Sequence, residues 1–412
     1  MFVSECRMCQ SGNLHKFLDL GKTPPADQFL FAAQLEQPEA SYPLQVVICD
    51  DCGLIQLNYE VAADVLYRDN YPYESSTTLA GRAHWKEFAE TTTRILNLGA
   101  DDLVVDVGSN VGVLLQMFRE SGTRVLGVDP ADNIASIANK NGIETIAAFF
   151  DGETANRIIA TKGQAKVITA TNVFAHIGDM NGFMRAVDGL LSETGAFIIE
   201  APYAVELLQN LEYDTIYHEH LSYLSLKPMQ RFFAKFDMEI FEVQRRDIHG
   251  GSFRVFVRRR RPGNPAVSSI IAELLLGEQR AEIYDHGTLH RFATSVEKNR
   301  SDLRELIIGL KRNGKRIAGV SAPAKGMTLL NYCGLGPELL DFVTEKSKLK
   351  IGRYTPGQHL PVVSDDALLE QGCDYALLLA WNFAEEIMGN LKAFSDRGGK
   401  FIIPIPTPKI VG

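Results

Sequence analysis

Short apolar runs and longer polar stretches alternate along the middle of this chain. Apolar runs lie at 103–107, 124–128, 167–171 and 195–200, and the first is followed by a glycine turn and a helical stretch at 113–120. Brief apolar runs bounded by turn residues are typical of buried strands. Their alternation with helices is typical of a parallel sheet covered by helices. We therefore predict an α/β protein.

The pattern changes on both sides of this central region. A helical stretch at about 77–97 precedes it, and a long charged helical region at about 266–313 follows it. After that region, a second strand–loop–helix unit lies at 316–332. The basic run and Pro-Gly-Asn-Pro turn at 258–265 mark a junction. We predict an N-terminal module at 1–68, the central sheet domain at 69–261 and a smaller Rossmann-like domain at 262–412.

The composition narrows the class of protein. The chain has 412 residues, 45% apolar and 23% charged, with a formal net charge of −9 and a pI near 5.6. The excess of acidic residues argues against nucleic acid as a partner, because proteins that bind nucleic acid usually carry a basic face. No apolar run approaches the roughly 18 residues that span a membrane, and Glu5 and Cys6 lie where a signal peptide needs an apolar core. We expect a cytoplasmic monomer without membrane contact.

Four of the six cysteines form two Cys-x-x-Cys pairs near the N-terminus. They are Cys6 with Cys9 and Cys49 with Cys52, and Gly53 allows a tight turn after the second pair. Each pair brings two thiolates to one tetrahedral metal ion. A redox dithiol or buried free cysteines would not explain two pairs together. We predict a zinc ion bound by all four cysteines, which leaves no open coordination position and makes the zinc structural.

The glycine turn after the first apolar run has the pattern D-x-G-S-N-x-G. It resembles the first motif of class I S-adenosylmethionine methyltransferases more than the G-x-G-x-x-G of nicotinamide sites. Glycines let the backbone approach a ligand, and the next helix offers free N–H groups. The second apolar run ends in an acid that can accept hydrogen bonds from ribose hydroxyls. The predicted cofactor contacts are Asp106, Gly108, Asn110, Gly112, Asp129, Phe149, Phe150 and Asn172.

The stretch 214–223, DTIYHEHLSY, concentrates acid–base chemistry. Its imidazoles, carboxylate and phenols can pass protons to and from a bound substrate. His218 and His220 would share a face on a strand but not on a helix. One alternative is a polar turn whose histidines bond the backbone. Another is a zinc hydrolase site, although the four cysteines already account for a zinc ion.

Two further segments offer ligand contacts. The loop YPYESS contains Tyr71 and Tyr73, and it is either a linker or a cover for a pocket. Lys325 at a glycine turn and Arg353 in a glycine-bounded loop either bind a phosphate or remain solvated.

Taken together, these motifs resemble the zinc-containing nucleotide-sugar C-methyltransferases that make branched deoxysugars, the deoxysugar C-3 methyltransferases. The resemblance spans nearly the full length and rests on CxxC…CxxCG, YPYESS, DVGSNVGVLL, GVDP, ATNVFAHI, YHEHLSY, HGGS, SAPAKGMTLLNY, GRYTPG and AWNFAEEI in this order. It implies a zinc domain, a central S-adenosylmethionine-binding domain and a C-terminal domain that helps hold a nucleotide-sugar. Val111 departs from the family, which often has Asp there; the turn depends on its glycines and Asn110, so cofactor binding should persist.

The resemblance also implies the reaction. A base removes the proton beside the ketone of a nucleotide-linked keto-deoxysugar, and the enolate carbon attacks the methyl group. Imidazole, with a pKa near about 6.5, suits the base role. By resemblance His220 is the base, Glu219 orients it or shares its proton, and Tyr217 donates to the enolate oxygen. Further implied residues are His176, Tyr71 and Tyr73 for catalysis and Lys325, Arg353, Tyr223 and His249 for the substrate.

Several alternatives remain open from the sequence. His176 would in the simplest case be a buried histidine bonded to the backbone, and His249 would only fix the HGGS turn. A zinc-ribbon RNA methyltransferase would need a basic face. A non-catalytic carbohydrate-binding protein would leave the substrate proton in place, so exchange with solvent deuterium distinguishes it.

Overall fold

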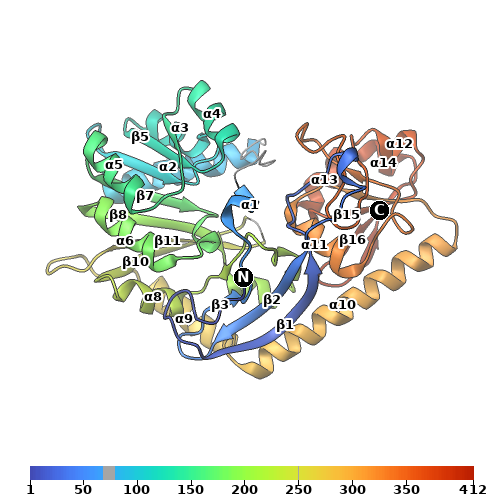
Figure 1. Cartoon of the computed structure of the whole chain (residues 1–412), viewed down its shortest axis with the longest axis horizontal. Coiled ribbons are helices and arrows are strands. Elements are labelled where there is room, and N and C mark those ends of the chain that lie inside the picture. The colour runs from blue at the N-terminus through green and yellow to red at the C-terminus, as the bar shows by residue number, and fades with distance from the viewer. Residues whose placement is uncertain (68–78, 249) are drawn as a thin grey trace.

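The computed structural model describes residues 1–67, 79–248 and 250–412. They form three sheets (Figure 1). The predicted α/β fold, with a zinc-binding N-terminal module, a central methyltransferase sheet and a C-terminal Rossmann-like domain, is confirmed. Within these residues, every helix is too short or too polar to span a bilayer.

The N-terminal sheet is antiparallel, with the strand order β1-β2-β3-β9. Its fourth strand comes from the stretch 214–223, far along the chain, because β9 pairs with the edge of β3. The sheet therefore extends beyond residue 68, where we predict the N-terminal module to end. The elements are β1 (Leu14–Thr23), η1 (Ala32–Gln34), β2 (Tyr42–Cys49), β3 (Ile55–Leu57), α1 (Ala63–Tyr67) and β9 (Ser222–Tyr223).

The central sheet has seven strands in the order β10-β11-β8-β7-β4-β5-β6. Strand β11 runs in the direction opposite to that of all the other strands of this sheet. The chain moves from β4 to β5 and β6 on one side, then returns to β7 and β8 on the other. Ligands of open α/β sheets bind at such a switch point, outside the carboxyl ends of the strands. The strands are β4 (Leu103–Val107), β5 (Arg124–Asp129), β6 (Thr145–Ala147), β7 (Ala165–Thr171), β8 (Leu191–Pro202), β10 (Met238–Arg246) and β11 (Ser252–Arg259).

Helices cover both faces of this sheet. Val104 and Ile198 pack with α2 and α3, whereas the adjacent Val105 and Phe197 pack with α5, α6 and α8. Neighbouring side chains of a strand point to opposite faces, so a sheet covered twice needs continuous apolar strands. The helices are α2 (Leu79–Leu96), α3 (Val113–Glu120), α4 (Asp132–Lys140), α5 (Gly152–Lys162), η2 (Phe174–His176), α6 (Met180–Leu190), α7 (Ala204–Gln209), η3 (Tyr213–Thr215) and α8 (Leu226–Ala234).

The C-terminal sheet has the order β14-β13-β12-β15-β16-β17 and is parallel except for β17. The long charged region before it forms two helices separated by a turn. The elements are α9 (Ile270–Arg280), α10 (His286–Arg312), β12 (Ile317–Val320), α11 (Ala324–Cys333), β13 (Val343–Thr344), β14 (Val362–Val363), α12 (Ala367–Glu370), β15 (Tyr375–Leu378), η4 (Trp381–Phe383), α13 (Ala384–Asn390), α14 (Lys392–Asp396), β16 (Lys400–Ile403) and β17 (Lys409–Val411).

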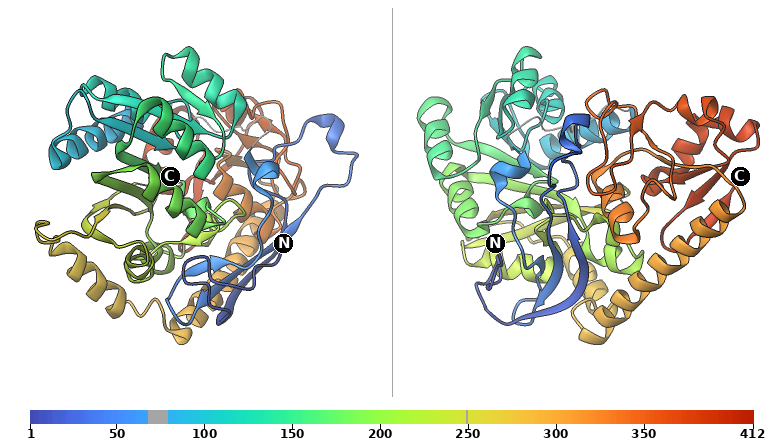
Figure 2. Two further views of the ribbon diagram at one scale, coloured as in Figure 1. Left: turned by 60° about the vertical axis from the view of Figure 1, so that its left-hand side comes forward. Right: turned by 45° about the vertical axis from the view of Figure 1, so that its right-hand side comes forward.

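One buried cluster contains residues of all three parts. Val46 of β2, Ile216 beside η3 and Leu330 of α11 belong to the same cluster, and α10 runs beneath the N-terminal strands toward the C-terminal sheet (Figure 1). The loop between β1 and β2 reaches the C-terminal domain, beside which it lies in the right-hand view of Figure 2. There Leu30 and Tyr354 exchange two backbone hydrogen bonds of 2.9 and 2.8 Å. The fold therefore holds the stretch 214–223 between the N-terminal sheet and α11.

Candidate active site

The four predicted zinc ligands meet at one point. The Sγ atoms of Cys6, Cys9, Cys49 and Cys52 all lie within 4.8 Å of one another. The Sγ atoms of Cys6 and Cys52 are 3.5 Å apart, as are those of Cys9 and Cys49. A tetrahedral zinc with Zn–S bonds of about 2.3 Å needs sulfurs about 3.8 Å apart, so the set fits zinc with no ligand position left open.

The predicted cofactor turn lies at the carboxyl end of β4. Gly108 and Gly112 adopt φ of 67° and 83°, and Asn110 adopts φ of 50°. A Cβ on Gly108 would lie 2.3 Å from Val173 Cγ2, so this position also needs glycine for space. The turn leads into α3, whose first N–H groups have no side-chain cap. These features fit S-adenosylmethionine, because a bare turn and a helix start can approach its polar groups.

Asp129 ends β5 beside this turn. Its carboxylate accepts the backbone N–H of Asn110 at 2.9 Å and that of Ala131 at 3.0 Å. Each carboxylate oxygen retains a lone pair that can accept a ribose hydroxyl. Asp106 is buried and accepts the Thr169 hydroxyl at 2.6 Å. Burial, with Asp129 nearby, raises the pKa of Asp106 to about 7.

The remaining predicted cofactor residues lie at the same edge of the sheet. Asn172 follows β7 with φ of 55°. Phe149 and Phe150 follow β6, and the Phe150 ring packs edge-on against Phe183 with centroids 5.3 Å apart. Glu200, at the end of β8, is bound by His84 at 2.5 Å and by Arg254 at 2.8 Å. That carboxylate is therefore held by the protein itself.

The stretch 214–223 folds so that both ring nitrogens of His220 have partners. Nδ1 lies 2.8 Å from the carbonyl oxygen of Thr215, and Nε2 lies 2.7 Å from the hydroxyl of Tyr217. A carbonyl oxygen only accepts, so the neutral ring carries its proton on Nδ1 and its lone pair on Nε2. The Tyr217 hydroxyl then donates to Nε2. This arrangement gives His220 one basic nitrogen in a fixed direction.

His176 lies beside this pair. Its ring centroid is 5.1 Å from that of His220 and 6.1 Å from that of Tyr67, on which it stacks. The Nε2 atom of His176 is buried, and no hydrogen-bond partner for it lies among the described residues. Burial, together with the charge of His220, lowers the pKa of His176 well below its usual value. A neutral imidazole with an unused nitrogen is suited to donate to or accept from a substrate.

The two residues that precede His220, His218 and Glu219, contact other parts of the protein. His218 Nε2 lies 3.3 Å from the carbonyl oxygen of Tyr42, and burial lowers the pKa of His218 to about 4. Glu219 is buried near Asp27 and Lys350, and burial together with Asp27 raises the pKa of Glu219 to about 8. Since the Thr215 carbonyl binds His220 Nδ1, orientation of this ring by Glu219, as the resemblance implies, would need a different arrangement.

The predicted substrate residues occupy different surroundings. Lys325 lies in the first turn of α11, with its ammonium group 3.9 Å from Asp214 and 4.2 Å from the centre of the Trp381 ring. Arg353 stacks on Phe31 at 4.4 Å, and no described carboxylate lies within salt-bridge distance of it. Tyr223 is buried in β9 within the N-terminal sheet. Tyr71, Tyr73 and His249 lie outside the described residues.

Sequence reasoning missed the groups that come from the backbone or from distant parts of the chain. The Thr215 carbonyl is invisible in a pattern of side chains. Asp27 and Lys350 form an ion pair of 3.2 Å across 323 positions of sequence. Trp381 stands out in the sequence only as part of AWNFAEEI, and its indole N–H donates to Asp214 at 2.7 Å.

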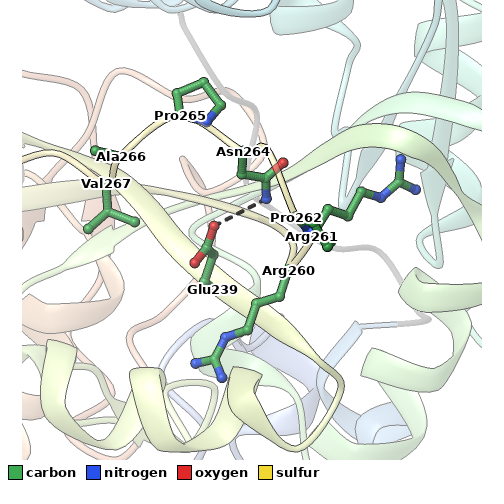
Figure 3. A pocket seen from close by; sticks show the side chains of 8 residues that line it. All are labelled: Glu239, Arg260, Arg261, Pro262, Asn264, Pro265, Ala266 and Val267. Carbon is green, nitrogen blue, oxygen red and sulfur yellow. Dashed lines mark hydrogen bonds between the residues drawn. The ribbon is translucent and has the colours of Figure 1, made fainter.

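A surface pocket near the end of β11 lies away from this site (Figure 3). It is lined by Glu239, Arg260, Arg261 and Asn264, with Asn264 donating to Glu239 at 3.3 Å. The adjacent Arg258 pairs with Ala196 at the start of the apolar part of β8. The pocket therefore lies at the amino ends of the parallel strands, opposite the edge that carries the cofactor turn.

Comparisons with known proteins agree with these features. A family model described as "Methyltransferase domain" matches residues 81–243. Others described as "C-methyltransferase C-terminal domain" and "Putative zinc binding domain" match residues 247–406 and 6–67. These matches define the class: a methyltransferase with a zinc-binding N-terminal domain.

The full-length comparison is more specific. "C-methyltransferase NovU" from Streptomyces niveus is 38% identical over 409 residues, which cover 99% of this chain and 97% of that protein. The chain belongs to this family of C-methyltransferases, which use S-adenosylmethionine, and it carries a zinc site of four cysteines. Membership argues against a zinc hydrolase and against a non-catalytic binding protein.

Two further similarities each cover less than half of this chain. A ubiquinone biosynthesis O-methyltransferase from Methylobacterium sp. (strain 4-46) is 27% identical over 95 residues, 23% of this chain and 38% of that protein. The crystal structure of an S-adenosylmethionine-dependent methyltransferase from Clostridium acetobutylicum is 15% identical with a TM-score of 0.35, covering 43% of this chain and 92% of that one.

Proposed function

We propose that this C-methyltransferase acts on a nucleotide-linked keto-deoxysugar, with His220 as the general base. The observation that carries the proposal is the pair of hydrogen bonds on His220, which leaves the lone pair on Nε2 beside the Tyr217 hydroxyl. A base of this kind suits removal of a proton that a neighbouring ketone acidifies. We propose a nucleotide-linked sugar as the substrate because the chain shares motifs with nucleotide-sugar C-methyltransferases.

The proposed reaction uses the two groups in turn. When substrate binds, the Tyr217 hydroxyl turns from Nε2 to the ketone oxygen, which frees the Nε2 lone pair. Nε2 of His220 then takes the proton, the C–H electron pair forms the enolate, and the Tyr217 hydroxyl donates to the enolate oxygen. The enolate carbon then forms a bond to the methyl group as the bond from that methyl to sulfur breaks. S-Adenosylmethionine, when bound at the β4–α3 turn, supplies this electrophilic methyl group.

Arg353 is the better placed of the two proposed phosphate contacts. Lys325 lies near Asp214 and Glu212, and these carboxylates would compete with a diphosphate for its ammonium group. Arg353 is half-buried on Phe31, where a guanidinium can still bind phosphate through two N–H groups. We expect Arg353→Ala to raise the KM for the nucleotide-sugar about tenfold or more. The exposed Arg312→Ala is the control and should leave this KM unchanged.

The function is tested with purified protein, S-adenosylmethionine and a panel of nucleotide-linked ketosugars, with mass detection of a methyl gain. His220→Ala should lower turnover by about 10²–10⁴-fold, the range of a positioned general base, while the Kd for S-adenosylmethionine stays within a few-fold by calorimetry. The exposed His290→Ala serves as the matched control.

Proton exchange separates the base step from methyl transfer. In heavy water without a methyl donor, wild-type protein should exchange the substrate proton beside the ketone, and His220→Ala should not. Retained turnover in His220→Ala would reject His220 as base. Absence of methyl gain and of exchange across the panel would reject the sugar as substrate.

A further inference from the structure

We infer that Thr328 and Trp381 of the C-terminal domain are positioning residues for methyl transfer, because they fix the segment whose carbonyl oxygen binds His220. The inference rests on the proposed role of His220 as base. It assigns the C-terminal domain a part in orienting the base, in addition to holding a substrate.

The segment concerned is η3 and the residue after it. Thr215 ends η3, and its carbonyl oxygen accepts the Nδ1–H of His220 at 2.8 Å. A single 3₁₀ turn has few hydrogen bonds of its own. Inside this segment they are Thr215 N–H to Glu212 O at 3.0 Å, Ile216 N–H to Tyr213 O at 3.1 Å and the Thr215 hydroxyl to Glu212 O at 2.7 Å. The direction of the Thr215 carbonyl therefore depends on what holds the residues on either side of it.

The C-terminal domain binds the residues on both sides of Thr215. Before Thr215, the Asp214 carboxylate accepts the indole N–H of Trp381 at 2.7 Å. After Thr215, the Ile216 carbonyl accepts the Thr328 hydroxyl at 3.0 Å. Thr328 lies on α11 and Trp381 in η4, so two separate elements of one domain bind the two neighbours of Thr215.

A third contact fixes the start of the turn. The Tyr213 hydroxyl donates to the side-chain oxygen of Asn299 at 2.8 Å, and Asn299 donates to the carbonyl oxygens of Pro404 and Pro406 at 2.8 and 2.9 Å. Asn299 lies on α10 and is buried. Residues on both sides of Thr215 are thus bound by side chains that are themselves packed or hydrogen-bonded in the C-terminal domain.

The charge at Asp214 adds to this constraint. Asp214 is fully buried, and its Oδ1 atom has no hydrogen-bond partner among the described residues. Its other oxygen has the indole N–H and, 3.9 Å away, the Lys325 ammonium. A buried carboxylate that loses one of few donors will move toward another, so removal of the indole N–H should displace η3. Displacement of a catalytic group by about 1 Å can lower a rate by up to about 10²-fold.

The test compares side chains of nearly equal shape. Thr328→Val removes the hydroxyl and keeps the volume, Thr328→Ser restores the hydroxyl, and Trp381→Phe removes the indole N–H. Thr294→Val is the matched control, because this Thr is exposed on α10 and its hydroxyl bonds only its own helix at 3.0 Å. Each full-length protein is measured for kcat, for the KM of both substrates, and for the His220 tautomer by ¹⁵N NMR of histidine-labelled protein.

We expect Thr328→Val and Trp381→Phe to lower kcat by about tenfold to 10²-fold with the S-adenosylmethionine KM unchanged. The fraction of His220 in the Nδ1–H tautomer should fall in both variants. Thr328→Ser should recover kcat to within about threefold, one hydrogen bond being worth about a tenfold change in rate. Thr294→Val should match wild type in every measurement.

Three outcomes would overturn the inference. They are wild-type kcat in both Thr328→Val and Trp381→Phe, a loss of kcat with an unchanged His220 tautomer, and a Thr328→Ser variant as slow as Thr328→Val. The last two would mean that these residues only support packing. Failure of the proposed function is distinct, because it appears as retained turnover in His220→Ala whatever the Thr328 variants do.

Discussion

His218 and His220 show how backbone contacts decide what a polar side chain can do. The sequence places them two residues apart and makes them chemically equal. In the structure, His218 faces the Tyr42 carbonyl in β2 and has a pKa lowered to about 4 by burial, so it is neutral at pH 7. His220 faces Thr215 and Tyr217. No pattern of side chains distinguishes the two, because the difference lies in which carbonyl oxygen each ring meets.

Glu219 leads to a prediction of pH-dependent stability. Burial and Asp27 raise its pKa from 4.5 to about 8. Between these values the folded carboxyl holds a proton that the unfolded chain releases, so its contribution to stability is fully present below about pH 4.5 and is lost as the pH rises through about 8. Glu219→Gln cannot titrate. We therefore expect the Tm of the wild type to fall relative to that of Glu219→Gln between pH 5 and pH 8.5.

Thermal unfolding of both proteins at several pH values makes this measurement. Other groups titrate in both proteins and cancel in the difference. Tm curves that stay parallel across this range would contradict a raised pKa at Glu219.

At the scale of elements, local patterns predicted well what local sequence controls. The helix at 113–120 and the strand ending at Asp129 lie where the apolar pattern puts them, because strand, turn and helix are neighbours in sequence. The two-residue strand β9 was not predicted. It exists only because Ser222 and Tyr223 meet β3, which lies far earlier in the chain. A strand that short has no period to detect.

The start of α8 depends on another non-local contact. The buried carboxylate of Glu278, on α9, accepts the backbone N–H groups of Leu226 at 2.5 Å and Lys227 at 3.1 Å, where α8 begins. It also accepts the hydroxyls of Tyr203 at 2.9 Å and Tyr284 at 2.6 Å. A side chain from another helix thus caps α8, a role that the residues around Ser225 do not reveal.

Glu278→Ala should be among the most destabilising single changes. It would leave three donors without this partner, while the Tyr284 hydroxyl can still donate to Ser225 at 3.0 Å. Each buried unsatisfied group costs about 1–3 kcal/mol, so we expect a loss of about 3–5 kcal/mol in the free energy of unfolding. Urea denaturation makes the measurement. Glu273→Ala, an exposed acid on the same helix, is the control and should change it by less than about 0.5 kcal/mol. Equal stabilities of the two variants would show that α8 does not need this cap.

At the scale of the whole molecule, the zinc site is joined to the stretch that carries His220. Arg7, between the first two zinc ligands, is buried and donates to the carbonyl oxygens of Leu57 at 2.7 Å and Leu221 at 3.5 Å. Leu221 follows His220 directly. A structural zinc can therefore control activity without contacting the substrate.

Removal of zinc should lower the rate of methyl transfer. A chelator that extracts the metal, or Cys49→Ser, is expected to lower activity by at least about tenfold and to lower the Tm, because metal binding stabilises a site of this kind. Metal analysis of untreated protein should find about one zinc per chain. Replacement of zinc by Cd²⁺ should restore activity, because a metal bound by four thiolates has only a structural role and another tetrahedral ion can fill it. Full activity in metal-free protein would remove the link between zinc and His220.

The order of domains was predictable because each domain has its own local motif: cysteine pairs, a glycine turn, and a second strand–loop–helix unit. The contacts between domains were not. Asp214 with Trp381 and Asp27 with Lys350 join residues far apart in sequence, and each side chain read alone is an ordinary polar residue. The parts of the site that orient His220 arise from such pairs.

The strand β9 and the Leu30–Tyr354 contact also set the order in which the protein can fold during translation. The ribosome makes β1, β2 and β3 first, yet the edge of β3 has no partner until residues 222–223 emerge, and the loop at residue 30 has none until residue 354 does. Until then, the exposed N–H and C=O groups of this strand edge can pair with strands of other chains. The part of the protein synthesised first is therefore completed last.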